Sequence, residues 1–132
     1  MVLIVEDDAP FRRMIKETVH AHYPFSGISE ASDGIEAFQA INARIPDIIF
    51  MDIRLPGESG LVLTKKIKDK YPGVVIVILT SYDQREYRKS AFQNGATYFL
   101  QKGVTTPGEI INVLDDALLR KGNGYHMGEF WT

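Results

Sequence analysis

The chain has 132 residues, of which 45% are hydrophobic and 24% are charged, with a formal net charge of −2. This length suits one domain with its own core, and the small net charge gives no general attraction to nucleic acid or to an anionic membrane. Cysteine is absent, which excludes disulfides and thiolate metal sites. No apolar run approaches the roughly 20 residues of a membrane span, and no basic leader precedes the first apolar run. We therefore expect a soluble, cytoplasmic protein with no membrane partner.

The N-terminal part alternates between strand and helix patterns. Val2–Val5 is an apolar run typical of a buried strand, and a helix follows with Asp8 as N-cap and Pro10 in its first turn. Its apolar residues have helical spacing: Phe11, Met14, Ile15 and Val19. Ser26–Ala31 predicts a weaker strand near a sheet edge. Asp33 then begins a capping box, and the helix it opens is expected to direct three apolar residues inward: Ile35, Phe38 and Ile41.

The middle of the chain continues this alternation. Asp47–Met51 predicts the third strand, and a helix is expected from about Ser59 to Lys70 with Leu63 and Ile67 facing inward. Val74–Leu79 is apolar without alternation, which is typical of a central parallel strand covered on both faces.

The C-terminal part adds a short polar helix over Asp83–Asn94, with Gly95 as a C-cap glycine. Thr97–Leu100 predicts the fifth strand, and Thr106–Glu109 is a capping box with proline at the first helical position. The last helix is expected to bury its apolar residues: Ile110, Ile111, Leu114, Ala117 and Leu118.

Five strands and five helices in strict alternation predict an α/β fold, a doubly wound five-stranded parallel sheet with helices on both faces. We expect one domain over residues 1–121. Residues 122–132 are glycine-rich with scattered aromatics, and we expect them to be a tail or the start of an interdomain linker.

Polar side chains follow four of the five expected strands. The acidic run Glu6–Asp8 follows the first, Asp52 the third, Thr80 the fourth and Lys102 the fifth. Parallel strands bring their carboxyl ends to one rim, where ligands bind in such sheets. Three acids there would resist ionisation without a cation, and Mg²⁺ suits such oxygen ligands. The set favours an aspartate that attacks a phosphoryl group, with lysine and threonine binding its oxygens.

In kind and order, these residues resemble the receiver domains of two-component response regulators, which have a flavodoxin-like fold. Leu55–Gly60 is similar to the loop after the phosphoacceptor, and Asn94–Ala96 with Tyr98 is similar to the start of the fifth strand. The resemblance covers about residues 1–121. The spacing between the site residues is most similar to receivers of LuxR-type helix-turn-helix regulators.

The resemblance implies a role for each acid. Asp52 would be the phosphoacceptor, receiving the phosphoryl group from a sensor histidine kinase. Asp7, Asp52 and the backbone carbonyl of Arg54 would bind Mg²⁺ directly, and Glu6 would act through water. Asp8 is assigned to capping the first helix.

The resemblance also implies a switch. Thr80 and Lys102 would bind the phosphoryl oxygens, and the Tyr98 rotamer would follow Thr80. The face formed by the fourth helix, fifth strand and fifth helix would then bind a downstream partner or a second copy of the chain. Phosphotransfer and dephosphorylation would be partly self-catalysed, with Arg54 and Tyr82 beside the site affecting the phosphoryl lifetime. The domain itself is not expected to bind nucleic acid, and transcription regulation is implied only with an output domain.

One departure from the family and two alternatives remain open. Receivers commonly have proline after the lysine, often with a cis bond, whereas Gly103 follows Lys102 here. Because a cis bond before a non-proline residue costs about 3 kcal/mol, we expect a trans bond or a mobile loop. The alternatives are a pseudo-receiver that interacts without phosphotransfer, which would bind Mg²⁺ poorly, and a flavodoxin-like enzyme or cofactor binder. Against the latter, no glycine-rich phosphate loop follows the first strand.

Overall fold

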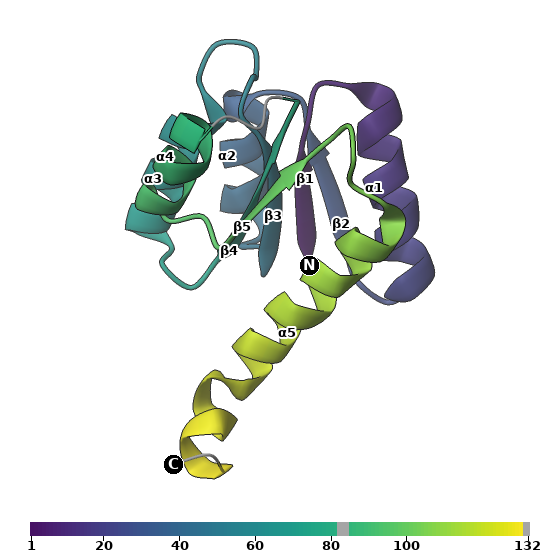
Figure 1. Ribbon diagram of the computed structural model, residues 1–132, viewed down its shortest axis with the longest axis vertical. Helices are drawn as coiled ribbons and strands as arrows, with labels where there is room; N and C mark the ends of the chain where they lie inside the picture. Colours follow the sequence, from purple (N-terminus) through teal and green to yellow (C-terminus); the bar gives the residue numbers. More distant parts are fainter. Residues whose placement is uncertain (82–84, 131–132) are drawn as a thin grey trace.

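The computed structural model describes residues 1–81 and 85–130, with only the backbone for residues 121–130. Tyr82 and the expected helix start at Asp83 lie outside the described residues. The predicted fold class is confirmed by one five-stranded parallel sheet in the order β2-β1-β3-β4-β5 (Figure 1). The strands are β1 (Val2–Val5), β2 (Ile28–Ala31), β3 (Ile48–Asp52), β4 (Val75–Thr80) and β5 (Tyr98–Gln101). The helices are α1 (Ala9–His22), α2 (Gly34–Ala43), α3 (Gly60–Lys70), α4 (Arg85–Gln93) and α5 (Pro107–Phe130).

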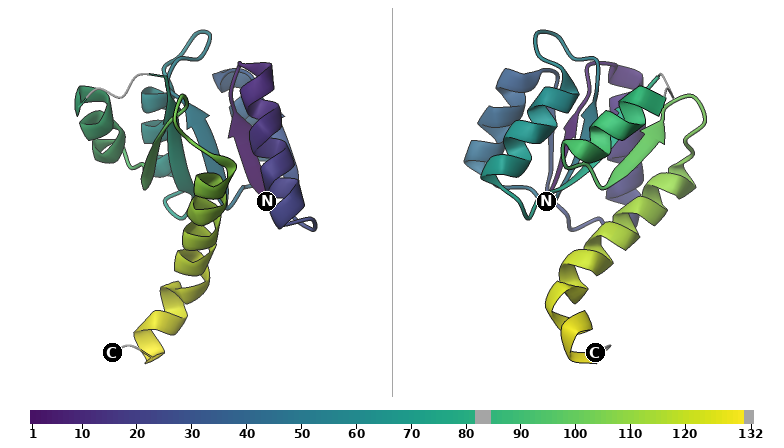
Figure 2. Two further views of the ribbon diagram at one scale, coloured as in Figure 1. Left: turned by 45° about the vertical axis from the view of Figure 1, so that its right-hand side comes forward. Right: turned by 60° about the vertical axis from the view of Figure 1, so that its left-hand side comes forward.

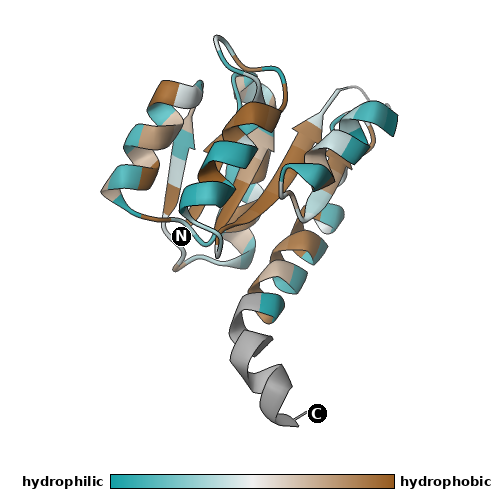
Figure 3. Cartoon of the chain, turned by 90° about the vertical axis from the view of Figure 1, so that its left-hand side faces the viewer, coloured by the Kyte–Doolittle hydropathy of each residue, from teal (hydrophilic) through white to brown (hydrophobic). Residues whose placement is uncertain are grey.

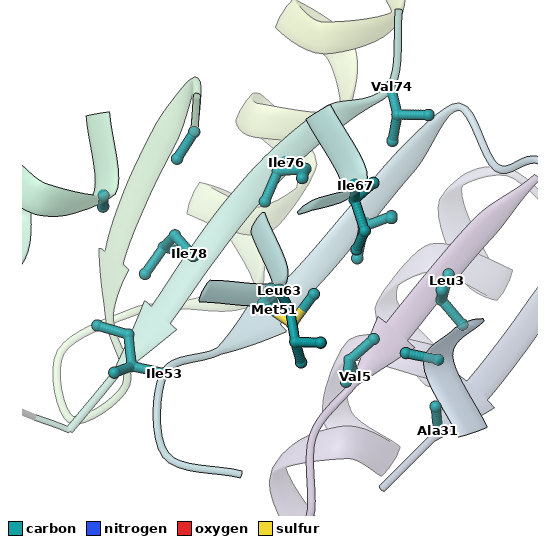
Figure 4. Packing of buried hydrophobic residues seen from close by; sticks show 14 of the residues in the cluster. Leu3, Val5, Ala31, Met51, Ile53, Leu63, Ile67, Val74, Ile76 and Ile78 are labelled. Atoms are coloured by element: carbon teal, nitrogen blue, oxygen red, sulfur yellow. The ribbon is translucent and has the colours of Figure 1, made fainter. Parts of the chain in front are cut away.

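Helices cover both faces of the sheet, α1 and α5 on one and α2, α3 and α4 on the other (Figures 1 and 2). Side chains alternate along each strand, so Ile48 and Phe50 pack beneath α1 and α5, while Ile49 and Met51 face the other layer. On that second face, Leu63 of α3 packs against the strands (Figure 4). In the hydropathy colouring the central strands are mostly brown, whereas the helices carry both teal and brown segments (Figure 3).

Several local predictions are confirmed. The Asp33 side chain accepts a hydrogen bond from the Glu36 amide at 2.8 Å, and Thr106 Oγ1 accepts one from the Glu109 amide at 3.2 Å. Gly95 follows the end of α4 with a φ of 107°, a backbone conformation that residues other than glycine rarely adopt. The Lys102–Gly103 bond is trans, since the described residues contain no cis peptide bond.

One local expectation was confirmed only in part, and one was wrong. Asp8 occupies the N-cap position of α1, but its side chain makes no capping hydrogen bond. Pro10 stands second in the helix and has no N–H to donate, which removes one of the two amides that such a cap uses. Of the three residues expected to face inward, Ile41 is buried and Phe38 is partly buried, but Ile35 is 73% exposed, because α2 buries Gly34 and Ala37 beside Ile41.

The last helix extends further than expected. The sequence predicted no regular element after about residue 121, whereas α5 continues to Phe130. This stretch contains no proline, and each interior glycine costs only about 1 kcal/mol, so nothing in it forces the helix to stop. Among the described residues, no helix has both the length and the hydropathy needed to cross a membrane.

The strand order positions the functional residues. The chain passes from β1 outward to β2 and then returns across β1 to β3, so the carboxyl ends of β1 and β3 are neighbours. The loops after these ends lie at the top of the sheet in Figure 1. This reversal of direction creates the crevice in which open α/β sheets bind ligands.

Candidate functional site

Strand register brings the predicted acids together. Val5 pairs with Met51, so Glu6 and Asp52, the next residues along, end adjacent strands. Asp7 follows in the β1–α1 connection. One carboxylate oxygen from each of these three residues lies within 4.8 Å of the others. The expected clustering of acids at the ends of buried strands is thus present, and the role of each acid as a ligand stays a prediction.

Glu6 is the most buried of the three acids, with no exposed surface. Its Oε2 accepts a hydrogen bond from the Asp8 amide at 3.1 Å, and its Oε1 lies 2.5 Å from Nζ of Lys102. Burial, reinforced by the hydrogen bond and charge of Asp52, raises the pKa of Glu6 to about 7, while Lys102 opposes this shift. The single lysine thus offsets only part of the repulsion among the carboxylates.

Lys102 joins the two buried acids. Its Nζ lies 3.1 Å from Oδ2 of Asp52, and only 13% of its side chain is exposed. Burial lowers the Lys102 pKa, but hydrogen bonding to Glu6 and the charges of both acids outweigh that effect and raise it. The ring of Phe11 also faces this ammonium, 5.3 Å from Nζ to the ring centre. Lys102 is therefore a fixed cation beside Asp52.

Asp52 is 4% exposed and ends β3, so its backbone is fixed by sheet hydrogen bonds. Its Oδ1 accepts a long hydrogen bond, 3.4 Å, from the Arg54 amide. The next loop packs tightly against it: a Cβ at Gly60 would lie 1.8 Å from the Asp52 carbonyl oxygen. Gly60 donates to the Ile53 carbonyl at 2.8 Å and accepts from the buried Thr64 hydroxyl at 2.7 Å. The sequence predicted that Gly60 lies in this loop, but it did not indicate that only glycine fits so close to the Asp52 carbonyl.

A pocket of about 280 Å³ opens over the cluster, large enough for a phosphoryl group with bound water. Its lining residues are Asp7, Asp8, Asp52, Arg54, Ser81 and Lys102. A larger pocket, about 470 Å³, is bordered by Met1, Pro24 and Leu118, and Asp47 is its only described acid. Because phosphoryl chemistry needs charged and polar groups, the smaller pocket is the functional candidate.

Thr80 and Tyr98 differ in their relation to this pocket. Thr80 is 2% exposed at the end of β4, and its carbonyl accepts a hydrogen bond from the Lys102 amide at 2.8 Å. Tyr98 donates its hydroxyl to Asp116 of α5, whose carboxylate also accepts a hydrogen bond from Arg120 at 3.0 Å. Burial and Asp116 raise the Tyr98 pKa to about 12. Its side chain is thus held by α5, and coupling to Thr80 stays a prediction.

The donor set fits a divalent cation. Three carboxylates face one lysine, which leaves uncompensated negative charge, and hard oxygen ligands are those that Mg²⁺ and Ca²⁺ prefer. In the described part of the chain, Oε1 of Glu6 is also a fully buried oxygen whose contact is the ion pair with Lys102. A bound cation would stabilise this charge and lower the Glu6 pKa.

Comparisons with known proteins agree with this arrangement. Residues 2–115 match the family described as the response regulator receiver domain. The oxygen regulatory protein NreC of Staphylococcus aureus (strain JH9) is 35% identical over 132 residues, which is 99% of this chain and 57% of NreC. The chain therefore spans little more than half the length of that relative.

Solved structures give the same result. The receiver domain of NtrX from Brucella abortus is 29% identical, with a TM-score of 0.82 over 89% of this chain and 98% of that one. The signal receiver domain of NarL from Mycobacterium tuberculosis is 28% identical, with a TM-score of 0.80 over 88% of this chain and 94% of that one. NreC and NarL also support the predicted likeness to LuxR-type receivers. The chain belongs to the response regulator receiver domain family, whose general role is phosphorylation-dependent signalling in two-component systems.

Proposed function

We propose that Asp52 accepts a phosphoryl group from a phosphohistidine of a sensor kinase, in a step that requires Mg²⁺. The observation that carries this proposal is the position of Asp52, a nearly buried carboxylate 3.1 Å from a lysine and within 4.8 Å of two further acids. In this site the carboxylate of Asp52 can act as the nucleophile. The neighbouring acids can bind a cation, and the lysine can bind an anionic oxygen.

The transfer step is an in-line displacement. A carboxylate oxygen of Asp52 attacks phosphorus, the new O–P bond forms as the N–P bond of phosphohistidine breaks, and the imidazole nitrogen keeps the electron pair. Lys102, already 3.1 Å from Oδ2, is positioned to pair with a phosphoryl oxygen. Thr80 would bind a second phosphoryl oxygen from the adjacent strand end. In dephosphorylation, a water oxygen attacks the same phosphorus and the Asp52 carboxylate leaves with the electron pair of the O–P bond, so the domain itself contributes to both steps.

Mg²⁺ would be held by the carboxylates of Asp7 and Asp52 and the backbone carbonyl of Arg54, with Glu6 contributing through water. When bound, the ion would neutralise charge on the phosphoryl oxygens while the phosphoryl group is transferred. The clustering of the three carboxylate oxygens supports this ligand set. The raised Glu6 pKa is the complementary observation, since it marks a buried acid that lacks full charge compensation.

The output is proposed to be a shift in the face formed by α4, β5 and α5. Tyr98 belongs to this face and contacts Asp116 and Arg120 of α5. If phosphorylation draws Thr80 toward the site, Tyr98 would follow and favour binding of a partner or a second copy. Beryllofluoride with Mg²⁺, a phosphoryl mimic, should shift amide NMR signals of Tyr98 and α5. Shifts restricted to the Asp52 loop would refute the switch.

Because NreC is a regulatory protein nearly twice as long, we propose a transcriptional output through a further domain. We propose that it acts in the cytoplasm, where a kinase has ATP.

Acetyl phosphate labelling tests the acceptor. Wild-type protein should gain an acid-labile, hydroxylamine-sensitive phosphoryl group in Mg²⁺ and none in chelator, and Asp52→Asn should lose it. Asp69→Asn is a matched control, because Asp69 is an exposed acid that pairs with Lys65 on α3. Undiminished labelling of the Asp52→Asn protein would exclude Asp52 as sole acceptor. Absence of both labelling and Mg²⁺ binding in the wild type would favour a pseudo-receiver.

A further inference from the structure

Arg12, in the first turn of α1, connects the acidic cluster to the edge strand. Its Nη1 donates a hydrogen bond to the backbone carbonyl of Glu6 at 2.6 Å, and its Nε donates to Oε1 of Glu30 on β2 at 3.2 Å. Lys16, one turn later, binds the other Glu30 oxygen at 3.1 Å. The Arg12 side chain is 23% exposed, so these contacts are partly shielded from water.

The Glu6 carbonyl group is important for the site because it belongs to the peptide that joins Glu6 to Asp7. The orientation of this peptide contributes to the direction in which the two side chains leave the backbone after β1. On its other side, the Glu6 amide donates to the Ala31 carbonyl of β2 at 3.0 Å. With Arg12 holding the carbonyl, both polar groups of the Glu6 backbone are fixed.

Charge and geometry both suit arginine to this position. A hydrogen bond from an ionised donor is roughly twice as strong as a neutral one. Guanidinium also presents several donors in a rigid plane and stays protonated at all relevant pH values. One side chain can therefore bind the Glu6 carbonyl and Glu30 together, which a single flexible ammonium does less well.

We propose that Arg12 is a positioning residue for the cation site, fixing the Glu6–Asp7 peptide so that both carboxylates face the metal, and that Glu30 in turn orients Arg12. The proposal rests on the proposed Mg²⁺ site and adds a residue that does not touch the ion. Groups that orient metal ligands in this way typically change metal affinity by 10–100-fold when removed.

The chain provides a matched control. Arg13 is the neighbouring arginine on α1 and is exposed. Arg12→Ala is expected to weaken Mg²⁺ binding about tenfold, and Arg13→Ala is expected to leave it unchanged. Arg12→Lys should recover part of the loss, since it restores a charged donor. Glu30→Gln should give a smaller loss, because it weakens only the orientation of Arg12.

The experiment is a Mg²⁺ titration followed by amide NMR of the whole chain, with circular dichroism confirming that each variant is folded. A loss of affinity in Arg12→Ala and Glu30→Gln but not in Arg13→Ala supports the proposal. Unchanged affinity in both Arg12→Ala and Glu30→Gln overturns it, even if their melting temperatures fall, since that is the result of a purely structural role. Should Arg12→Ala not fold, Arg12→Lys and Glu30→Gln decide in the same way.

Asp7→Asn separates this inference from the proposed function. If Asp7→Asn abolishes Mg²⁺ binding while Arg12→Ala and Glu30→Gln retain it in full, the Arg12 proposal fails and the metal site stands. If Asp7→Asn binds Mg²⁺ as tightly as the wild type, the metal site itself fails, and the Arg12 proposal fails with it.

Discussion

Glu6→Gln should change how the stability of the metal-free domain depends on pH. The pKa of Glu6 rises from 4.5 to about 7 on folding, mainly through burial. The folded state therefore holds a proton on Glu6 more tightly than the unfolded chain does. Below pH 4.5 the residue is protonated in both states, and above pH 7 it is ionised in both, with the buried charge then destabilising the folded state. Stability from this group is thus lost as pH rises from 4.5 to 7.

The magnitude follows from the shift. One pKa unit corresponds to about 1.4 kcal/mol, so a rise from 4.5 to about 7 corresponds to a loss of about 3 kcal/mol across this interval. Glutamine has nearly the same shape and no titration, so the Glu6→Gln protein should not show this loss. Titrating groups that do not contact Glu6 contribute equally to both proteins and cancel in the difference.

Urea unfolding at several pH values on both sides of this interval measures the effect. The free energy of unfolding of wild type minus that of Glu6→Gln should fall by about 3 kcal/mol as pH rises from 4.5 to 7. Saturating Mg²⁺ should reduce the fall, because a bound cation stabilises the ionised carboxylate. Parallel pH curves for the two metal-free proteins would refute the reasoning, because they would show that the pKa of Glu6 is not raised in the folded state.

Three further substitutions test the packing and charge of the site. Gly60→Ala would place a Cβ 1.8 Å from the Asp52 carbonyl, where real Cβ contacts are not closer than 3.0 Å, so we expect a loss of at least about 2 kcal/mol in urea unfolding; unchanged stability would contradict the close approach. Lys102→Met should slow acetyl phosphate labelling of Asp52 at least about tenfold, and an unchanged labelling rate would show that Lys102 does not assist transfer. Tyr98→Phe loses the hydrogen bond to Asp116 and should cost about 1 kcal/mol in unfolding free energy while the labelling rate stays the same; a slower rate would place Tyr98 in the transfer step itself.

The acids of the site were predictable because their positions depend on a simple rule. Apolar runs such as Val74–Leu79 identify buried parallel strands, and parallel strands end at one rim. Glu6, Asp52 and Lys102 were therefore expected to meet, and the ion pairs between them confirm that they do. The order of residues along the chain contained this information without any knowledge of side-chain contacts.

The residues that support the site were harder to predict. Arg12 acts on the Glu6 carbonyl, and its partner Glu30 comes from another strand, so no local pattern marks the contact. Gly60 is required by a close approach to Asp52 that depends on how the loop folds back. A glycine at the first position of a helix, where it costs helix stability, is a weak signal that sequence reasoning could have used. Ile35 was misplaced because Ile41 can share a helical face either with Ile35 and Phe38 or with Gly34 and Ala37, and the second of these faces is the buried one.

Borohydride reduction tests the central claim most directly. Reduction converts an aspartyl phosphate into homoserine, so peptide mapping by mass spectrometry identifies the acceptor itself. After incubation with acetyl phosphate and Mg²⁺, homoserine should appear at position 52 and be absent when Mg²⁺ is chelated. Homoserine at Asp7 or Asp8 with none at Asp52, or no homoserine despite phosphoryl incorporation, would contradict the account.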